Sequence, residues 1–188
     1  MSEFAEYAPD AEREDRFAVR RKLIIRPAQE SDLPAVAAIA AAREGEPVAG
    51  WIDKMKQVGA EGRAGRAILY AASLDGRVIG YARAGYFAAP AGSPANVVPE
   101  GWYLTGVVVE PSMRRRGVGS ELTRARLDWV AERSDCAYYV ANERNLVSID
   151  LHAGLGFVEL TRDFHHPGVE FAGGRGILFV CDLRAVRR

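Results

Sequence analysis

Residues 107–120 read Val107-Val108-Val109-Glu110-Pro111-Ser112-Met113-Arg114-Arg115-Arg116-Gly117-Val118-Gly119-Ser120. The three valines indicate a strand that Pro111 closes, and the residues from Gly117 onward place apolar side chains at helical spacing. A helix N-terminus has unpaired backbone N–H groups and about half a positive charge, so a glycine-rich entry lets a phosphate approach these donors closely. The order of strand, basic turn, glycine and helix therefore predicts an anion cradle, with three arginines adding charge and Ser120 a hydroxyl donor.

Two familiar phosphate motifs do not fit this segment. The Walker A pattern needs Lys-Ser or Lys-Thr after its glycines, and neither follows here. The dinucleotide fingerprint GxGxxG fails because Leu122 stands where its third glycine belongs. A plainer interpretation also stays open, in which the arginines form a solvated turn and the glycines only permit a tight bend.

Strands and helices are interleaved along the rest of the chain, which indicates one mixed α/β sheet. The hairpin signal Asp75-Gly76 joins two of the strands, and Ser31 or Asp32 caps the first helix. Apolar residues at 118, 122, 125 and 129 predict the buried face of the helix that follows the cradle. We expect strands at 23–26, 67–73, 78–87, 103–109, 137–140, 157–163 and 177–183, helices at 33–40, 51–58, 117–133 and 145–153, and loops at 59–66, 90–101 and 165–176.

The chain has 188 residues, of which 48% are hydrophobic and 27% charged, a composition typical of one soluble domain. We expect residues 1–22, which mix both charges densely, to be a tail or surface helix, and residues 23–188 to be a single domain. Lys plus Arg equals Asp plus Glu at 25 each, so no net charge favours nucleic acid or an anionic membrane as a partner. The sequence shows no pattern of a signal peptide, membrane span or metal site, and we expect a cytoplasmic protein with reduced Cys136 and Cys181.

Two blocks of the sequence resemble the GCN5-related N-acetyltransferases, the GNAT superfamily. The first is the cradle itself, where Arg114-x-x-Gly117-x-Gly119 is similar to the family's acyl-CoA-binding pattern Q/R-x-x-G-x-G/A after a strand. The second is Asn145-x-x-Ser148-x-x-Leu151-His152-x-x-Leu155-Gly156-Phe157, which resembles the family's later segment N-x-x-A-x-x-L-Y-x-x-x-G-F. The opening Ile25-Arg26-Pro27-Ala28 with Asp32 also resembles the usual start of these proteins, so the likeness extends over residues 23–183.

The resemblance implies a fold and a co-substrate. The fold is α/β (α+β), with a central mixed, mostly antiparallel sheet that is flanked by helices and splayed between the strands at 102–109 and 136–141. Acetyl-CoA is the implied co-substrate; backbone amides of the cradle hold its pyrophosphate, and its pantetheine arm pairs with the valine strand like an added strand. The implied cofactor-binding residues are Val107, Val108, Val109, Arg114, Arg115, Arg116, Gly117, Val118, Gly119, Ser120, Asn145 and Ser148.

The resemblance also implies residues for the reaction. Where the family has a tyrosine that protonates the departing thiolate, this chain has His152, which is a workable proton donor at an unperturbed pKa of about 6.5. His152 is also open to interpretation as a histidine bonded within the helix packing, and Ser148 as a small residue that lets the cofactor approach. Tyr103 stands where some members carry a glutamate that acts as the general base. The candidates for the group that removes the ammonium proton are therefore Tyr103, Glu100, Glu143 and a water chain.

Together these features predict an acetyl-CoA-dependent N-acyltransferase that acetylates a primary amine of a small molecule by direct attack in a ternary complex. Acetylation of protein N-termini or lysines is an alternative enzymatic function, and a non-catalytic acyl-CoA-binding sensor is an alternative of another class. We expect the loops at 88–101 and 165–176, together with the early helices, to shape the acceptor pocket. The acceptor's identity, the acyl chain preference and a possible homodimer are left open by the sequence.

Overall fold

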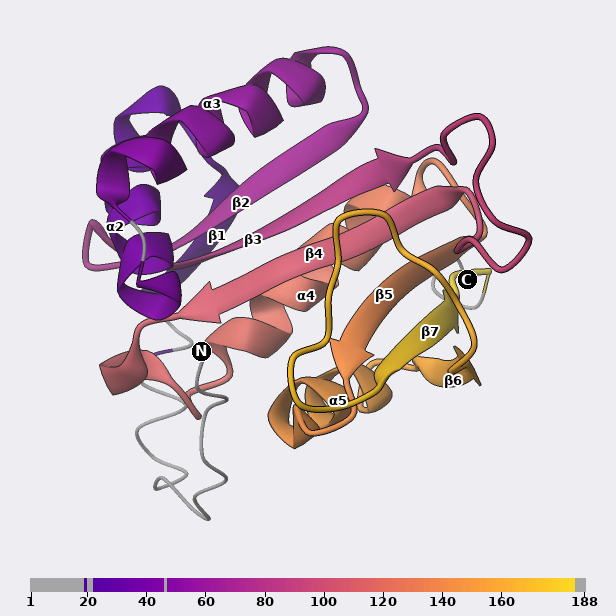
Figure 1. Cartoon of the computed structure of the whole chain (residues 1–188). Coiled ribbons are helices and arrows are strands. Elements are labelled where there is room, and N and C mark those ends of the chain that lie inside the picture. The colour runs from indigo at the N-terminus through magenta and orange to yellow at the C-terminus, as the bar shows by residue number, and fades with distance from the viewer. Residues whose placement is uncertain (1–18, 20–21, 46, 185–188) are drawn as a thin grey trace.

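The computed structural model describes residues 19, 22–45 and 47–184, which form a sheet with helices on both of its faces (Figure 1). The strands are β1 (Leu23–Pro27), β2 (Ala67–Leu74), β3 (Arg77–Phe87), β4 (Gly101–Val109), β5 (Cys136–Asn142), β6 (Val158–Thr161) and β7 (Gly176–Asp182). The helices are α2 (Leu33–Glu44), α3 (Val48–Arg63), α4 (Val118–Ala131) and α5 (Leu146–Ala153), with short 3-10 turns at Glu30–Asp32 and Pro111–Met113. None of these described helices is long and apolar enough to cross a lipid bilayer.

The strands form one sheet in the order β1-β2-β3-β4-β5-β7-β6. All neighbours are antiparallel except β4 and β5, which run parallel and share only the residue pair Tyr103–Tyr138. Beyond that pair the two strands diverge, so the later half of β4 keeps a backbone edge that no strand of the described structure pairs with. This confirms the predicted mixed, mostly antiparallel sheet with a splay between these two strands.

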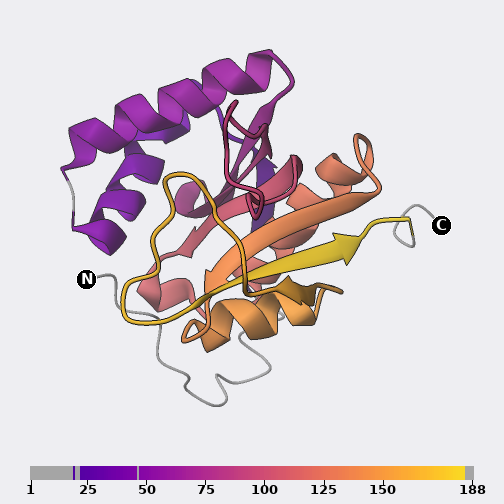
Figure 2. The same ribbon diagram turned by 45° about the vertical axis from the view of Figure 1, so that its right-hand side comes forward.

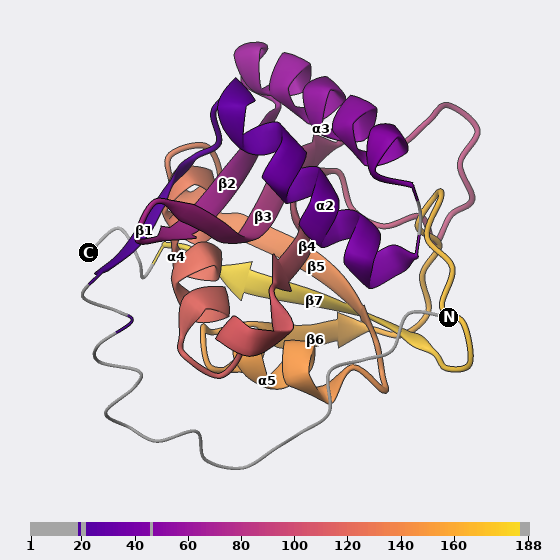
Figure 3. The same cartoon turned by 90° about the vertical axis from the view of Figure 1, so that its left-hand side faces the viewer.

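Helices cover both faces of the sheet and divide the core. On one face α2 and α3 bury Val36 and Met55 against Tyr81, and on the other face Leu122 of α4 packs on Ile79. Figure 3 shows α4 and α5 beside each other on the side of the sheet away from α3. The two faces of the seam between β4 and β5 therefore differ, because α4 backs one face whereas the loop between β6 and β7 crosses in front of the other (Figure 2).

Most elements end within a few residues of the predicted positions, and the largest difference is at helix α3. Helix α3 continues to Arg63, although Gly59 and Gly62 predict a loop from residue 59. A glycine inside a helix costs only about 1 kcal/mol, and buried Trp51 and Met55 fix α3 on the core, so tertiary packing outweighs the local preference. Strand β6 ends at 161, before the expected 163.

The buried face of α4 is rotated from the expected one. Val118 and Leu122 lie in the core as predicted, but Ala125 and Trp129 are only half-buried. The apolar pattern does not find the true face because that face includes a charged residue, Arg126. The buried residues of α4 are Val118, Leu122, Thr123, Arg126, Leu127, Val130 and Ala131.

Most of the expected N-terminal tail, residues 1–22, lies outside the described residues. Val19 is described, and it is buried beside Ile79 and Val118 in the core on the α4 face. Lys22 pairs with Asp75, with Nζ 3.3 Å from Oδ1. The described part of this segment therefore contributes one side chain to the core.

The close approach of β3 and β4 at Gly80 can be tested by substitution. A Cβ at Gly80 would lie 2.8 Å from the Val108 carbonyl oxygen, a backbone atom that cannot move aside. We expect Gly80→Ala to lower the free energy of unfolding by about 1–3 kcal/mol, the usual cost of overpacking.

In α3 a Cβ at Gly59 meets nothing within 4 Å. Gly59→Ala should therefore raise the free energy of unfolding by up to about 1 kcal/mol through its better helix propensity. Urea denaturation measures both changes, and a neutral Gly80→Ala would contradict the close approach.

Candidate active site

The open edge of β4 is the first part of the candidate site. Val107 and Val109 direct their backbone groups away from β3, because Val108 between them faces that strand. Two arginine side chains donate to the carbonyls that no strand pairs with: Arg43 Nη1 to Val107 O at 3.2 Å, and Arg114 Nε to Val109 O at 3.2 Å. The edge that the sequence predicts for the pantetheine arm is therefore present, and its pairing with that arm stays a prediction.

The turn between β4 and α4 has the backbone shape of an anion cradle. Arg115 has a φ of 65° and Gly117 a φ of 83°, and left-handed residues of this kind form concavities lined by N–H groups. The first hydrogen bond of α4 runs from the Glu121 N–H to Gly117 O at 3.1 Å, so the N–H groups of residues 118–120 have no carbonyl partner within the helix. A left-handed φ costs a residue such as Arg115 about 1–3 kcal/mol, and strain of this kind clusters at ligand sites. The backbone thus supports the predicted cradle, whose ligand stays a prediction.

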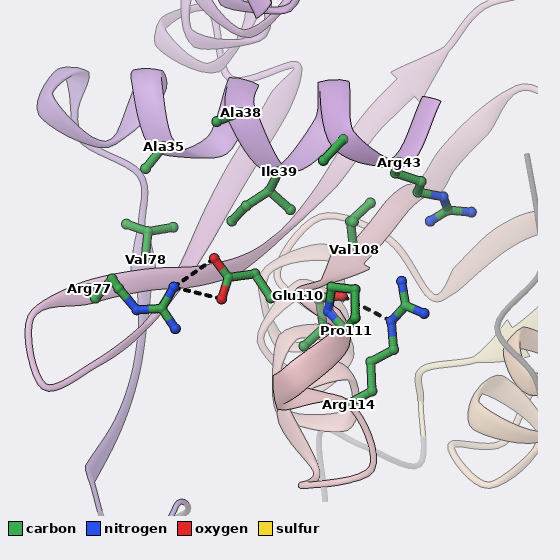
Figure 4. Close-up of a pocket in the computed structure, with 12 residues that line it drawn as sticks. Ala35, Ala38, Ile39, Arg43, Arg77, Val78, Val108, Glu110, Pro111 and Arg114 are labelled. Carbon is green, nitrogen blue, oxygen red and sulfur yellow. Dashed lines mark hydrogen bonds and ion pairs between the residues drawn. The ribbon is translucent and has the colours of Figure 1, made fainter. Parts of the chain in front are cut away.

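A cavity of about 370 Å³ lies between α2 and the end of β4 (Figure 4). Arg77 and Glu110 form an ion pair at one end, with both carboxylate oxygens within 2.8 Å of Arg77 Nη1, whereas Arg43 and Arg114 stand together at the other end. The three arginines outnumber the one carboxylate, so the cavity favours an anionic ligand. The lining residues are Ala35, Ala38, Ile39, Ala42, Arg43, Arg77, Val78, Val108, Val109, Glu110, Pro111 and Arg114.

Helix α5 brings Ser148 and His152 together, as their spacing predicts. Ser148 Oγ lies 3.4 Å from His152 Nδ1, and the Ser148 carbonyl oxygen lies 2.8 Å from the same nitrogen. Asn145 is the N-cap of the helix, where its Oδ1 accepts the Ser148 N–H at 3.2 Å. The side-chain oxygen of Asn145 is thus used within the protein, and its NH₂ group is the part that it offers to a ligand.

The ring of His152 is buried and packs in the core. It is 1% exposed, stacks on Tyr139 with 3.9 Å between ring centroids and meets Phe157 edge-on. Burial, with the charge of Arg126, lowers the pKa of His152 to about 4, so the ring is neutral at pH 7. Because the Ser148 carbonyl can only accept, the proton lies on Nδ1, and the buried Nε2 has no hydrogen-bond partner in the described structure. This environment disfavours an imidazolium acid and agrees with a histidine bonded within the helix packing.

The candidate bases lie in unequal settings. Tyr103 is 2% exposed, its hydroxyl donates to Pro99 O at 2.8 Å, and burial raises its pKa far above the usual value. A buried tyrosine that is protonated and already donating is a poor base at neutral pH. Glu100 is exposed and, among the described residues, accepts only the Ala89 N–H, at 3.1 Å. Glu143 accepts from the Arg175 backbone N–H at 3.0 Å and from Arg162 Nη1 at 3.4 Å, so Glu100 has the fewer partners of the two carboxylates.

The two loops expected to shape the acceptor pocket meet beside the seam. The Val98 N–H donates to His165 O at 2.9 Å, and the His165 N–H donates to Asn96 O at 2.8 Å. The His166 ring lies edge-on to Tyr103, with 5.7 Å between centroids. These contacts place both loops over the first half of β4, on the face opposite α4 (Figures 1 and 2).

Arg43, Arg83 and Arg126 lie near the seam but are not among the predicted site residues. The sequence does carry a signal for Arg126, because it stands four residues after Leu122 and four before Val130 on an apolar helix face. Arg83 likewise stands in an apolar stretch, residues 78–87, whereas Arg43 precedes Glu44 at the end of its helix, which is typical of a surface arginine. Their place near the seam depends on contacts between distant elements, which local sequence does not encode.

The sequence profile of the acetyltransferase (GNAT) family matches residues 6–157. This chain belongs to the GNAT family. Among curated proteins, the aminoglycoside N(6')-acetyltransferase type 1 of Klebsiella aerogenes is 32% identical over 107 residues, which are 54% of this chain and 66% of that protein. The match therefore spans just under two thirds of the relative's length.

Solved GNAT structures share the fold described above. The ribosomal-protein-alanine N-acetyltransferase of Brucella melitensis superposes with a TM-score of 0.66 at 24% identity, covering 85% of this chain and 99% of that one. The aminoglycoside antibiotic 6'-N-acetyltransferase of Acinetobacter haemolyticus gives 0.61 at 24% identity, covering 78% and 99%. At this level of identity the likeness establishes the GNAT fold alone.

The buried His152 predicts a pH dependence of stability. The unfolded chain binds a proton at this residue near pH 6.5, whereas the folded ring, with a pKa of about 4, does not. The contribution of His152 to the free energy of unfolding is therefore complete above about pH 6.5 and is lost as the pH falls toward 4, by up to about 3 kcal/mol.

Urea denaturation between pH 7.5 and 4.5 measures this loss, and the plot of unfolding free energy against pH should be flatter for His152→Phe than for the wild type. His165→Gln, in the loop between β6 and β7, is the control and should keep the wild-type slope. Parallel curves for His152→Phe and wild type would contradict the neutral buried ring.

Proposed function

We propose that this GNAT protein transfers the acetyl group of acetyl-CoA to a primary amine of a small molecule, by direct attack of the amine while both substrates are bound. The Klebsiella aerogenes relative supports a small-molecule acceptor, because its name gives an aminoglycoside amine. One observation carries the proposal: an anion cradle and an unpaired strand edge adjoin at the end of β4.

The cradle fits a pyrophosphate group. A Cβ built on Gly117 meets nothing within 4 Å, so the space beside the turn is open. The N–H groups of residues 118–120 and the positive end of α4 favour an anion there. Arg114 connects the cradle to the strand edge, because its side chain reaches from the turn to Val109 O.

The open edge of β4 fits the amide groups of a pantetheine arm. Such an arm pairs like an extra strand and needs N–H and C=O groups on an exposed edge, which Val107 and Val109 provide. Arg43 and Arg114 cover those carbonyls and release them when the arm binds, which leaves two guanidinium groups for phosphate oxygens. Backbone N–H groups along this edge polarise the thioester carbonyl.

Acetyl-CoA supplies the activated acyl group when it is bound, and the protein supplies orientation and proton transfer. We assign the removal of the ammonium proton to water, because the Tyr103 hydroxyl is buried and already donates to Pro99 O. Glu100 stands just before β4, about 20 Å along the strand from Val107, which is too far to take the proton directly. His152 packs α5 onto β5, and solvent protonates the departing thiolate. Asn145 and Ser148 stay candidate cofactor contacts at the start of α5.

Thiol release tests this proposal directly. The purified protein is incubated with acetyl-CoA and a panel of amines, and free thiol is followed with time. We expect release that depends on the amine, because the acyl group leaves CoA only when an acceptor is held in attack geometry. Binding of acetyl-CoA without release for any amine identifies a sensor module instead. No binding and no release removes the assignment.

Gly117 tests the cradle. We expect Gly117→Val to raise the Kd for CoA by about 100-fold or more, because the side chain would enter the space assigned to the pyrophosphate. Calorimetric titration with CoA measures the Kd. Gly76→Val is the matched control, since Gly76 has a φ of 81°, also meets nothing within 4 Å and lies in the turn between β2 and β3. The control carries similar backbone strain and should bind CoA like the wild type. An equal loss in both variants would assign the effect to folding.

A further inference from the structure

The middle of β4 is open to solvent, although β4 is the central strand of the sheet. Thr105 and Gly106 are exposed, whereas Leu104 before them and Val108 after them are buried. Side chains of neighbouring elements normally cover the centre of a sheet that has helices on both faces. The exposed pair therefore marks an opening in the cover of the sheet, beside the seam.

Arg83 of β3 lies across from this opening. The register shifts here, so that Ala82 pairs with Val107 and Arg83 with Thr105, leaving Gly106 as the extra residue of a bulge. The neighbours of Arg83 along β3 pack toward α4, so its own side chain projects from the opposite face, where α2, α3 and the loops lie. A Cβ built on Gly106 would meet Arg83 Nη2 at 3.4 Å and Nε at 3.5 Å. The Nε–Nη2 edge of the guanidinium is thus closed by the backbone of Gly106, and among the Arg83 nitrogens only Nε is buried without a partner, so a ligand reaches Arg83 at Nη1 and Nη2.

No anion balances Arg83 within the described residues. None of the ion pairs in residues 22–45 and 47–184 includes Arg83, and its buried Nε has no hydrogen-bond partner there. The charged groups that share its surroundings are Arg126, and Arg43 with its partner Glu44 at 3.2 Å. A guanidinium without a counter-ion favours an anion, which can bind at Nη1 and Nη2.

Arg126 fixes the backbone of Arg83 from the α4 face. Arg126 Nη1 donates to Arg83 O at 3.1 Å, and Nη2 donates to Thr123 Oγ1 at 2.8 Å. The main chain of Arg83 is therefore held at the register shift by a buried side chain. A charged group on a fixed central strand needs little ordering when a ligand binds, which favours its use in recognition.

We propose that Arg83 binds the carboxylate of the acceptor, so that the preferred acceptors are α-amino acids or their close derivatives. This inference rests on the proposed acetyl transfer and names its acceptor class. The Nη1 and Nη2 groups of a guanidinium take a carboxylate through two parallel hydrogen bonds. One carbon joins the amine and the carboxylate of an α-amino acid. A carboxylate held beside Gly106 therefore keeps the amine close to Val107, where the open edge of β4 begins.

The charges near the opening also disfavour a polycationic acceptor. Arg43 and Arg83 stand on the acceptor face, and Arg126 lies directly behind the strand. Glu44 pairs with Arg43, and the three arginines still leave a net positive charge, which repels a ligand with several ammonium groups and attracts one with a carboxylate. The acceptor class inferred here thus differs from the aminoglycoside in the name of the Klebsiella aerogenes relative.

Matched pairs of acceptors test the inference on the full chain. Each pair consists of an amino acid and its decarboxylated amine, such as phenylalanine with phenethylamine and leucine with isoamylamine, and kanamycin supplies a polycationic arm. We expect kcat/KM to be about 10- to 100-fold higher for the amino acid of each pair, the discrimination that one charge-assisted contact gives. Equal values within the pairs, or a preference for kanamycin, would overturn the inference.

Variants of Arg83 separate its role from a general effect. Arg83→Gln should raise KM for the amino acid by about 10- to 100-fold and remove the preference within each pair, with kcat and the KM for acetyl-CoA near wild type. Arg83→Lys keeps the charge but cannot form two parallel hydrogen bonds, so its KM for the amino acid should lie between those of the wild type and Arg83→Gln. Arg184→Gln, at an exposed arginine paired with Asp182 just after β7, is the matched control and should keep the full preference. Retention of the preference in Arg83→Gln rules out the assigned role of Arg83.

Failure of the proposed function can be told apart from failure of this inference. If no amine of any charge releases thiol, the transferase assignment fails, and calorimetric titration of the acetyl-CoA-loaded protein with phenylalanine decides the inference. Binding that is lost in Arg83→Gln and kept in Arg184→Gln supports an anion site. Absence of phenylalanine binding to the wild type overturns it.

Discussion

The residue pair Tyr103–Tyr138 alone joins β4 and β5 in register, and the rest of the site depends on that short junction. Because the strands diverge beyond it, the backbone of β4 keeps hydrogen-bonding groups that a continuous sheet would have used. Buried backbone groups without partners are costly, so such an edge persists only with substitutes at hand. Arg43 and Arg114 act as those substitutes, and both are side chains that a ligand can displace.

Features of the site other than the strand edge also lower the stability of the folded protein. Arg115 holds a left-handed φ, Arg83 keeps a buried donor without a partner, and the helix start after Gly117 leaves its N–H groups without helical partners. Each feature costs on the order of 1 kcal/mol or more. They cluster around one strand, whereas the cores on either side of the sheet are packed with apolar side chains. The rest of the fold therefore stabilises a strand whose polar groups are prepared for ligands.

The sequence predicts the fold well, and also the order of strand, turn and helix around the candidate cradle, because both rest on local rules. The valine strand, the proline that closes it and the glycine entry to α4 lie within fourteen consecutive residues, 107–120. The end of α3 is predicted wrongly because contacts of Trp51 and Met55 with the core decide it. The sequence leaves His152 open between a proton donor and a packed histidine, because its stacking on Tyr139 and its low pKa arise from residues of other elements.

Arg126 shows how burial reassigns the positive charge of this site. Burial, with the neighbouring charge of Arg83, lowers the pKa of Arg126 to about 9, so the guanidinium is still protonated at pH 7. The charge of Arg126 in turn helps to keep His152 neutral, because two buried cations so close together would repel each other. The positive charge on the α4 side of the sheet is therefore carried by Arg126, whereas the nearby His152 ring is neutral. In the proposed reaction the proton transfers are assigned to water on the solvent side of β4, and the α4 face supplies field and rigidity.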